Sequence, residues 1–254
     1  MQPVVAIVIA RGGSKRVPRK NVRSFCGHPL VAWSIVQAIN SRAVDRVVLS
    51  TDDDEIEEIG WRYGAEVIRR PDWPDADLVA ANRPILHAID VLEEDIGLDW
   101  TMVTLLPTSP MRKPDDIDRG VKHWHNTGGQ VCAFHRNRET FIYRDKGGVV
   151  AEAILTDKYR KHFSLASGIV TVNSPRWYKW FTPQLPSDYD KDLDSMILEA
   201  RDAPNNQLYY IEVEAWQVPE TDTLEEFDLC ELIMEHYILD GRGIEVYTDY
   251  GSAS

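Results

Sequence analysis

The run Val4-Val-Ala-Ile-Val-Ile-Ala10, continued by Arg11-Gly-Gly-Ser-Lys-Arg-Val-Pro-Arg-Lys-Asn21, is the most informative stretch of the sequence. Its first seven residues are apolar, which is typical of a strand buried on both faces. The following loop is basic, because residues 11–23 carry six positive charges and no negative one. Glycines let backbone N–H groups approach an anion closely, and Arg and Lys add charge where phosphates would lie. The loop therefore predicts a polyphosphate site, with a solvated basic turn as the alternative.

Two familiar phosphate motifs are excluded by this loop. A Walker loop requires a Gly-Lys pair followed by Ser or Thr, whereas here Ser14 precedes Lys15 and Arg16 follows it. The dinucleotide pattern G-x-G-x-x-G is also missing from the loop. The P-loop NTPase and dehydrogenase interpretations therefore lose their main support.

Short apolar runs alternate with helical patterns through the first 135 residues. This rhythm predicts an α/β fold, a Rossmann-like three-layer α/β/α arrangement with a mainly parallel sheet. Ligands of such sheets bind at the carboxyl ends of the strands, so the loops after Ala10, Thr51 and Leu106 should face one crevice. The expected strands are 4–10, 46–51, 66–68, 100–106 and 130–134, and the expected helices are 30–39, 53–63, 78–96 and one with Pro114 in its first turn.

The rhythm changes after residue 135. Residues 136–165 resemble an arm with a Gly147-Gly148 turn, and residues 183–206 form a long excursion rich in Pro, Asp and Asn. Strands are expected at 168–173 and 208–213. A helix is expected over 223–239, where Thr223 and Glu226 form a capping box. We expect residues 1–254 to form a single domain with these two appendages.

Composition narrows the class of protein. The 254 residues include 43% hydrophobic and 27% charged residues, as in ordinary globular proteins, so a disordered chain is not expected. The net charge of −13 disfavours nucleic acid as a partner. No apolar run approaches the length of about 20 residues that spans a bilayer, and no leader-like segment is seen, so we expect no membrane partner and a cytoplasmic location. The three cysteines are far apart and predict neither a zinc site nor a disulfide framework.

Residues 9–21 resemble the nucleotide-binding signature of the acylneuraminate cytidylyltransferases. These are the CMP–sialic acid synthetases and the relatives that activate other nonulosonic and 3-deoxy sugar acids. The resemblance spans residues 4–134 well and 168–238 more loosely. It also rests on the segments Val48–Asp52, Val67–Pro71, Leu105–Arg112 and Glu220–Phe227. It implies a nucleotidyltransferase fold and a reaction in which an acceptor oxygen attacks the α-phosphate of CTP. Pyrophosphate would leave with the help of Mg²⁺, so charge neutralisation and in-line positioning dominate the chemistry.

The resemblance also implies roles for residues of the loop. The catalytic and triphosphate-binding cations would be Arg11, Lys15 and Lys20. The cytosine would lie against the backbone near Ala10 and against Arg70. The remaining implied nucleotide-binding residues are Gly12, Gly13, Ser14 and Asn21.

Two carboxylates near the carboxyl-terminal helix are the implied Mg²⁺ ligands. Glu220 and Asp222 are two positions apart, so on an extended segment they project to one face. Mg²⁺ commonly takes only one or two carboxylates and keeps waters or phosphates elsewhere. The alternatives are that Asp222 caps the following helix and that Glu220 is a solvated loop acid. The cluster Asp52–Asp54 could also bind a metal, although acids in a first helical turn usually pair with the helix dipole.

The acceptor side departs from the family pattern. Leu106 stands where the sialic acid enzymes carry a Gln that faces the sugar, and Ser164 replaces an Arg that pairs with the sugar carboxylate. Loss of such a charged hydrogen bond should cost roughly 1.5–3 kcal/mol unless Arg160 substitutes for it. With Ser109, these residues are the candidate acceptor-binding positions. The acceptor is therefore expected to be a sugar acid or another small anionic molecule with a nucleophilic oxygen.

Three other functions stay open at this point. The donor could be another nucleotide such as GTP, or the chain could be a non-catalytic nucleotide-binding homologue. A nucleotide-sugar glycosyltransferase would carry an acidic metal motif after a central strand and would not be expected to carry the Arg-Gly-Gly-Ser-Lys loop. The family resemblance further implies a homodimer in which the arm roofs the partner's active site.

Overall fold

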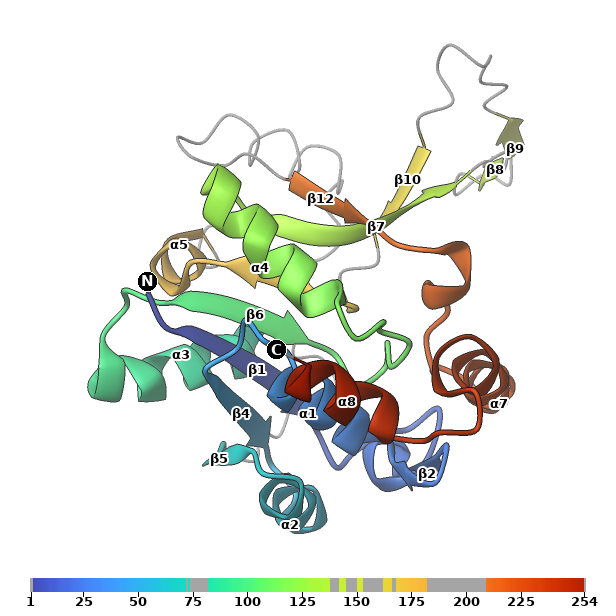
Figure 1. Cartoon of the computed structure of the whole chain (residues 1–254), viewed down its shortest axis with the longest axis horizontal. Coiled ribbons are helices and arrows are strands. Elements are labelled where there is room, and N and C mark those ends of the chain that lie inside the picture. The colour runs from blue at the N-terminus through green and yellow to red at the C-terminus, as the bar shows by residue number, and fades with distance from the viewer. Residues whose placement is uncertain are drawn as a thin grey trace.

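The computed structural model describes residues 2–71, 73, 82–137, 142–144, 150–152, 162–165, 168–181 and 209–253. In this part of the chain, the main sheet has the strand order β10-β7-β11-β6-β1-β4-β5, and β12 pairs with β7 (Figure 1). The predicted Rossmann-like α/β class is confirmed. The strands of the sheet are β1 (Val4–Ala10), β4 (Arg46–Thr51), β5 (Glu66–Arg69), β6 (Thr101–Leu105), β7 (Val131–Asn137), β10 (His162–Leu165), β11 (Thr171–Asn173) and β12 (Tyr209–Glu212).

Strand β1 lies at the centre of the parallel half of the sheet. It pairs in parallel with β4 on one side and with β6 on the other, and β5 extends the sheet beyond β4. The register sets Ala10 beside Thr51 and Val8 beside Leu105. The loops that leave β1, β4 and β6 therefore start from neighbouring positions at one edge, as the sequence predicted.

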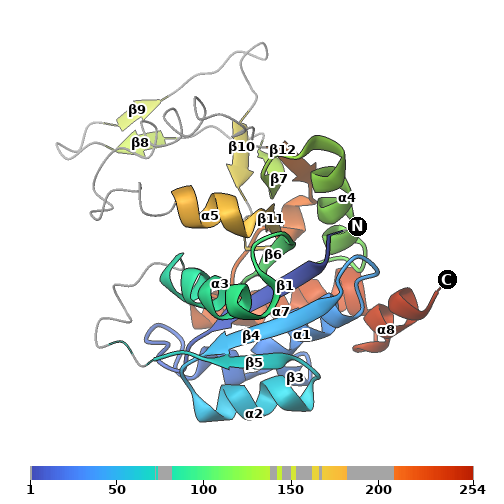
Figure 2. The same cartoon turned by 90° about the vertical axis from the view of Figure 1, so that its left-hand side faces the viewer.

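Helices cover both faces of this half because β1 is apolar on both. Alternate residues such as Ala6 and Val8 pack with the apolar faces of α1 (Leu30–Ile39), α2 (Asp54–Arg62) and α4 (Asp116–Thr127). Val5 and Ile7, between them in sequence, pack with α3 (Asn82–Ile96) on the opposite face (Figure 2). The core thus lies in two layers, and β1 carries the basic loop out of its centre.

The second half of the sheet is antiparallel where it joins the first. Strand β11 lies between β6 and β7 and runs opposite to both, and β10 also runs opposite to β7. The two ends of the arm predicted at 136–165 therefore belong to the main sheet. Strands β8 (Ile142–Arg144) and β9 (Val150–Glu152) form a separate two-stranded sheet that lies apart from the main one in both views (Figures 1 and 2). The predicted excursion at 183–206 lies outside the described residues.

The helices near the carboxyl terminus cover the outer side of α1. Helix α7 (Leu224–Met234) starts with the predicted capping box of Thr223 and Glu226 and continues as a π-helical turn, η4 (Glu235–Leu239). Apolar residues of α7 and of α8 (Glu245–Ser252) pack in one cluster with Trp33 of α1. Helix α4 begins at Asp116, with Asp115 as its N-cap residue. Pro114, predicted to lie in the first turn, therefore precedes the helix. The remaining elements are η1 (Lys20–Val22), β2 (Ser24–Phe25), β3 (His28–Pro29), α5 (Pro175–Phe181) and η3 (Ala215–Gln217).

Among the helices that the structure describes, none combines the length and the apolar character that crossing a bilayer requires.

Candidate functional site

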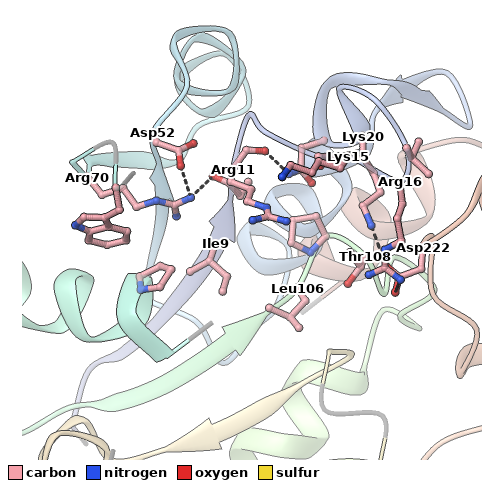
Figure 3. Close-up of a pocket in the computed structure, with 17 residues that line it drawn as sticks. Ile9, Arg11, Lys15, Arg16, Lys20, Asp52, Arg70, Leu106, Thr108 and Asp222 are labelled. Carbon is pink, nitrogen blue, oxygen red and sulfur yellow. Dashed lines mark hydrogen bonds and ion pairs between the residues drawn. The ribbon is translucent and has the colours of Figure 1, made fainter. Parts of the chain in front are cut away.

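A cavity of about 290 Å³ opens where the loops after β1, β4 and β6 meet. Figure 3 shows Arg70 and Asp52 at one end of it and Lys20, Arg16 and Asp222 at the other, with Arg11 between them. The sequence-predicted residues Ala10, Arg11, Ser14, Lys15, Lys20, Asn21, Arg70, Leu106 and Asp222 all line this cavity. It is lined as well by Ile9, Arg16, Val17, Asp52, Trp73, Pro84, Pro107 and Thr108.

The basic end of the cavity is organised around Asp222. One carboxylate oxygen of Asp222 lies 3.0 Å from Lys20 Nζ, and the other lies 2.9 Å from Arg16 Nη1. Burial would raise the pKa of Asp222, but the hydrogen bonds and charges of Lys20 and Arg16 outweigh it and hold the pKa below its usual value. The Lys20 side chain is 10% exposed and that of Arg16 is 70% exposed, so Lys20 is the more rigidly placed cation.

The short helix η1 explains how Lys20 comes to face the cavity. The preceding residue, Arg19, has a left-handed backbone with φ of 56°, which turns the chain into η1. Its guanidinium pairs with Asp53 and Glu55 at the start of α2. The hydrogen bond from Arg19 is the main reason that the pKa of Asp53 lies below its usual value. Arg19 therefore anchors the loop to α2, whereas Lys20 points into the cavity.

The two glycines of the loop have different surroundings. Gly12 N donates to Asp52 Oδ1 at 3.0 Å, and a Cβ atom at Gly12 would lie 2.2 Å from Asp53 Oδ2. Gly12 is therefore required by the close approach of the loop to α2. A Cβ atom at Gly13 would meet nothing within 4 Å. Asn21 also holds the loop in place, since its Nδ2 donates to the carbonyl of Arg11 at 2.9 Å.

Arg70 ties together the ends of the parallel strands. Its side chain is 4% exposed and donates to Asp52 Oδ2 at 2.9 Å, to the carbonyl of Ser50 at 3.2 Å and to the carbonyl of Ala10 at 3.3 Å. These bonds connect β1 and β4 at the edge of the cavity. Asp52, which the sequence analysis considered as a metal ligand or as a partner of the helix dipole, is held by Arg70 and by the Gly12 amide.

The acceptor-side residues separate into two groups. Leu106 and Thr108 line the cavity, whereas Ser109 is buried behind them and its Oγ donates to Glu220 Oε1 at 2.9 Å. A Cβ atom at Gly168 would lie 2.1 Å from Ser109 Oγ, so this contact requires glycine there. Of the two predicted Mg²⁺ ligands, Asp222 therefore lines the cavity and Glu220 does not.

Two of the predicted acceptor-side residues have a restricted description. The backbone of Ser164 lies in β10, opposite His135 of β7. Arg160 lies outside the described residues.

The alternative that Asp222 caps α7 is wrong, because Thr223 is the N-cap residue and its side chain accepts from Glu226 N. In the described part of the chain, no three or more His, Cys, Asp or Glu side chains are grouped so that they could hold a metal ion.

A buried arginine supports the loop after β6. Arg112 is fully buried and donates to the carbonyls of Leu106 at 2.7 Å and of Gly168 at 2.5 Å, as well as to the carbonyl of Ile169. Burial lowers the pKa of Arg112 to about 10, so it stays charged at neutral pH. Sequence reasoning quoted the segment Leu105–Arg112 but gave Arg112 no role. The signal that could have identified it is a charged residue at the end of an otherwise uncharged, proline-rich segment.

The sequence of this chain is similar to the sequences of known proteins. A family model described as cytidylyltransferase matches residues 5–152. The CMP-N,N'-diacetyllegionaminic acid synthase of Legionella pneumophila is 38% identical over 135 residues, which are 51% of this chain and 56% of that protein. The pseudaminic acid cytidylyltransferase of Campylobacter jejuni is 39% identical over 120 residues, 46% of this chain and 51% of that protein. The chain thus spans about half the length of the curated relatives it matches.

Solved structures show the same fold at low sequence identity. A CMP-2-keto-3-deoxy-manno-octonic acid synthetase complexed with CTP superposes with a TM-score of 0.68 at 16% identity. The superposition covers 92% of this chain and 99% of that chain. The likeness shows a shared fold.

Proposed function

Because the chain belongs to the cytidylyltransferase family, we propose that it transfers CMP from CTP to a nonulosonic sugar acid and releases pyrophosphate. The observation that carries this proposal is the two-ended cavity. At one end of the cavity Lys20 and the more exposed Arg16 offer positive charge for phosphates. At the other end the charge of Arg70 is paired with Asp52, and Trp73 lies beside the arginine. A nucleoside triphosphate has the matching distribution of charge.

The reaction would need little covalent help from the protein. A hydroxyl oxygen of the sugar acid attacks the α-phosphorus, and the bond from that phosphorus to the oxygen bridging it to the β-phosphorus breaks. The bridging oxygen leaves with pyrophosphate, and the hydroxyl proton passes to water. Lys20 and the cations beside it would stabilise the charge that develops on the phosphate oxygens. The Gly12 amide is already bonded to Asp52, so the open backbone at Gly13 is the part of the turn that phosphates could approach.

Asp222 is the best candidate for holding Mg²⁺. Both oxygens of Asp52, the other carboxylate that lines the cavity, are held by Arg70 and by the Gly12 amide. Asp222 is held by the side chains of Lys20 and Arg16, which phosphates could attract instead. One carboxylate with phosphate and water oxygens is a common environment for Mg²⁺. When bound, Mg²⁺ would neutralise charge on the departing pyrophosphate.

The Asp222→Asn variant should need at least about tenfold more Mg²⁺ for half-maximal pyrophosphate release, because loss of even an outer-shell partner typically costs about 10- to 100-fold in metal affinity and loss of a ligand charge should cost no less. Glu220→Gln is the matched control, since Glu220 lies behind the cavity on Ser109. The control should shift the Mg²⁺ titration by less than about threefold, because Glu220 does not line the cavity. An unchanged titration in Asp222→Asn would exclude Asp222 as a ligand.

The acceptor is proposed from the relatives and from the departures on the acceptor side. Legionaminic and pseudaminic acids are named as substrates of the two relatives, and both are acidic sugars. Leu106 gives the cavity an apolar wall where the sialic acid enzymes carry Gln. We therefore expect a nonulosonic acid that differs from the common sialic acids. A CTP-dependent reaction of this kind would take place in the cytoplasm, where CTP is made.

We also propose that the chain forms a homodimer. Strands β8 and β9 pair with each other outside the main sheet, as strands that contact a second copy would (Figure 1). Light scattering on the full chain should then give twice the chain mass of 29.0 kDa. A mass equal to one chain would contradict the dimer and leave the proposed chemistry untouched.

Calorimetric titration with CTP, GTP, UTP and ATP in the presence of Mg²⁺ tests the choice of donor. CTP should bind at least about tenfold more tightly than the others, a difference of about 1.4 kcal/mol. A preference for GTP would keep the chemistry and change the donor. Absence of binding by every nucleotide would contradict the proposed function.

A further inference from the structure

Trp73 lies in the wall of the cavity at its Arg70 end, and neither the basic loop nor the strand ends account for its presence there. Its indole ring is 5.9 Å from the Arg70 guanidinium carbon, measured to the ring centroid. Pro84 lines the same cavity. The Lys20 and Asp222 contacts occupy the opposite end (Figure 3). A ligand whose phosphates lie among the cations would therefore extend its other end toward Trp73.

The indole is held in place by the first turns of α3. The Arg83 guanidinium carbon lies 4.3 Å from the ring centroid, and His87 meets the ring edge-to-face with centroids 6.0 Å apart. Cation–π and edge-to-face contacts are favourable arrangements for an indole. Neither Arg83 nor His87 is among the described residues that line the cavity, so both support the ring from outside it.

Helix α3 is itself a rigid support. Ile85, Ala88 and Ile89 are buried against the sheet, and the Tyr178 hydroxyl donates to Asn82 Oδ1 at 2.7 Å at the start of the helix. A ring that is fixed before a ligand arrives loses little conformational entropy on binding. Trp73 therefore contributes a preformed apolar ring to the wall of the cavity.

We propose that Trp73 is a base-binding residue on which the nucleobase of the donor nucleotide stacks. This inference rests on the proposed function, because that function supplies the nucleotide and its orientation. An indole face contacts any planar base, so Trp73 contributes affinity, while the choice of base depends on polar groups such as Arg70 and the backbone at Ala10. The apolar contact also excludes water from the end of the cavity that lies opposite the phosphates.

Two substitutions separate stacking from a merely structural role. Trp73→Ala removes the aromatic ring and should raise the Kd of CTP with Mg²⁺ by about 5- to 150-fold, as expected for loss of one base–aromatic stack. Trp73→Phe keeps an aromatic face and should stay within about threefold of the wild type on the same scale. Trp61→Ala is the matched control, because Trp61 is 60% exposed on α2 and does not line the cavity. It should leave the Kd unchanged.

Fluorescence gives a second readout that a structural role would not change. The chain has eight tryptophans, so the signal of Trp73 is the difference between the wild type and Trp73→Phe. CTP should quench the wild type, and this part of the quench should be lost in Trp73→Phe although calorimetry still detects binding. Inorganic tripolyphosphate, which has no base, should compete with CTP equally well in the wild type and in Trp73→Ala.

The possible results are distinguishable from one another. Equal Kd values of CTP for the wild type and Trp73→Ala, or an equal quench in Trp73→Phe, would overturn the role of Trp73 and leave the proposed function standing. A parallel loss of tripolyphosphate affinity in Trp73→Ala would show that Trp73 only supports the frame of the site, and would also overturn the proposal. If the wild-type chain bound no CTP, the proposed function would fail together with this inference.

Discussion

Replacement of Lys20 by alanine should lower kcat/KM for CTP by about 100- to 1,000-fold, the usual effect of removing one preorganised group that stabilises transition-state charge. Lys20 is the cation that the structure fixes most firmly at the phosphate end of the cavity. Its side chain is 10% exposed and its Nζ lies 3.0 Å from Asp222 Oδ1. Arg16 also reaches Asp222, but with a side chain that is 70% exposed it is free to sample other positions and should not replace Lys20.

The fold should survive this substitution. Lys20 belongs to the short helix η1 and is not part of an apolar cluster among the described residues, so we expect a change in Tm of only a few degrees, about 1 kcal/mol in this size range. Lys122→Ala is a suitable control, because Lys122 is exposed on α4. Steady-state pyrophosphate release and a melting curve measure both effects. Turnover of the wild-type order in Lys20→Ala would remove Lys20 from the catalytic role.

Replacement of Arg112 by methionine should produce the largest loss of stability, about 3–5 kcal/mol, because it leaves several buried acceptors without a donor. The Arg112 guanidinium donates to the carbonyls of Leu106, Gly168 and Ile169, and also to Ser34 Oγ and Gln37 Oε1. No carboxylate among the described residues forms an ion pair with Arg112, so most of the effect comes from hydrogen bonds and packing, and the lost attraction to buried Asp116 and to Glu220 adds to it.

The expected decrease in Tm for Arg112→Met is roughly 10 °C, at about 2–4 °C for each kcal/mol in a chain of this size. Arg62→Met is the matched control, since Arg62 is exposed in the last turn of α2, and its free energy of unfolding should change by no more than about 0.5 kcal/mol. The Arg112 variant should also bind the acceptor more weakly, because Leu106 lines the cavity and is fixed by this contact. Equal melting temperatures of the two variants would contradict the assigned role of Arg112.

Local patterns predicted much of the fold. The apolar run of β1, the alternation of strands and helices up to β7 and the Thr223–Glu226 capping box each depend on neighbouring residues, and each is confirmed. The strand expected at 168–173 is shorter, spanning Thr171–Asn173. The carbonyls of Gly168 and Ile169 bond to Arg112, 56 and 57 positions away. A pattern in neighbouring residues cannot predict a contact between residues so far apart in the sequence.

The types of residue at the site could be predicted from the sequence, but the contacts that each of them makes could not. The six positive charges of the loop are obvious in the sequence, but only the folded chain shows that Arg19 turns back to α2 while Lys20 faces the cavity. In the same way, Glu220 and Asp222 look equivalent along the chain, yet buried Thr221 between them bonds to the loop after β6 and the two carboxylates have different partners. Trp73 had no periodic signal, because the contacts that hold it come from α3.

Phosphorus NMR of a single reaction mixture tests the proposed transfer most directly. The mixture contains the full chain, Mg²⁺, CTP and a nonulosonic acid, with parallel mixtures in which GTP replaces CTP or the acid is left out. We predict that pyrophosphate and a new phosphodiester signal, from CMP joined to the sugar acid, appear in equal amounts and only when CTP and the acid are both present. Tight binding of CTP without either signal, across a panel of such acids, would contradict the assignment of this chain as a CMP transferase acting on sugar acids.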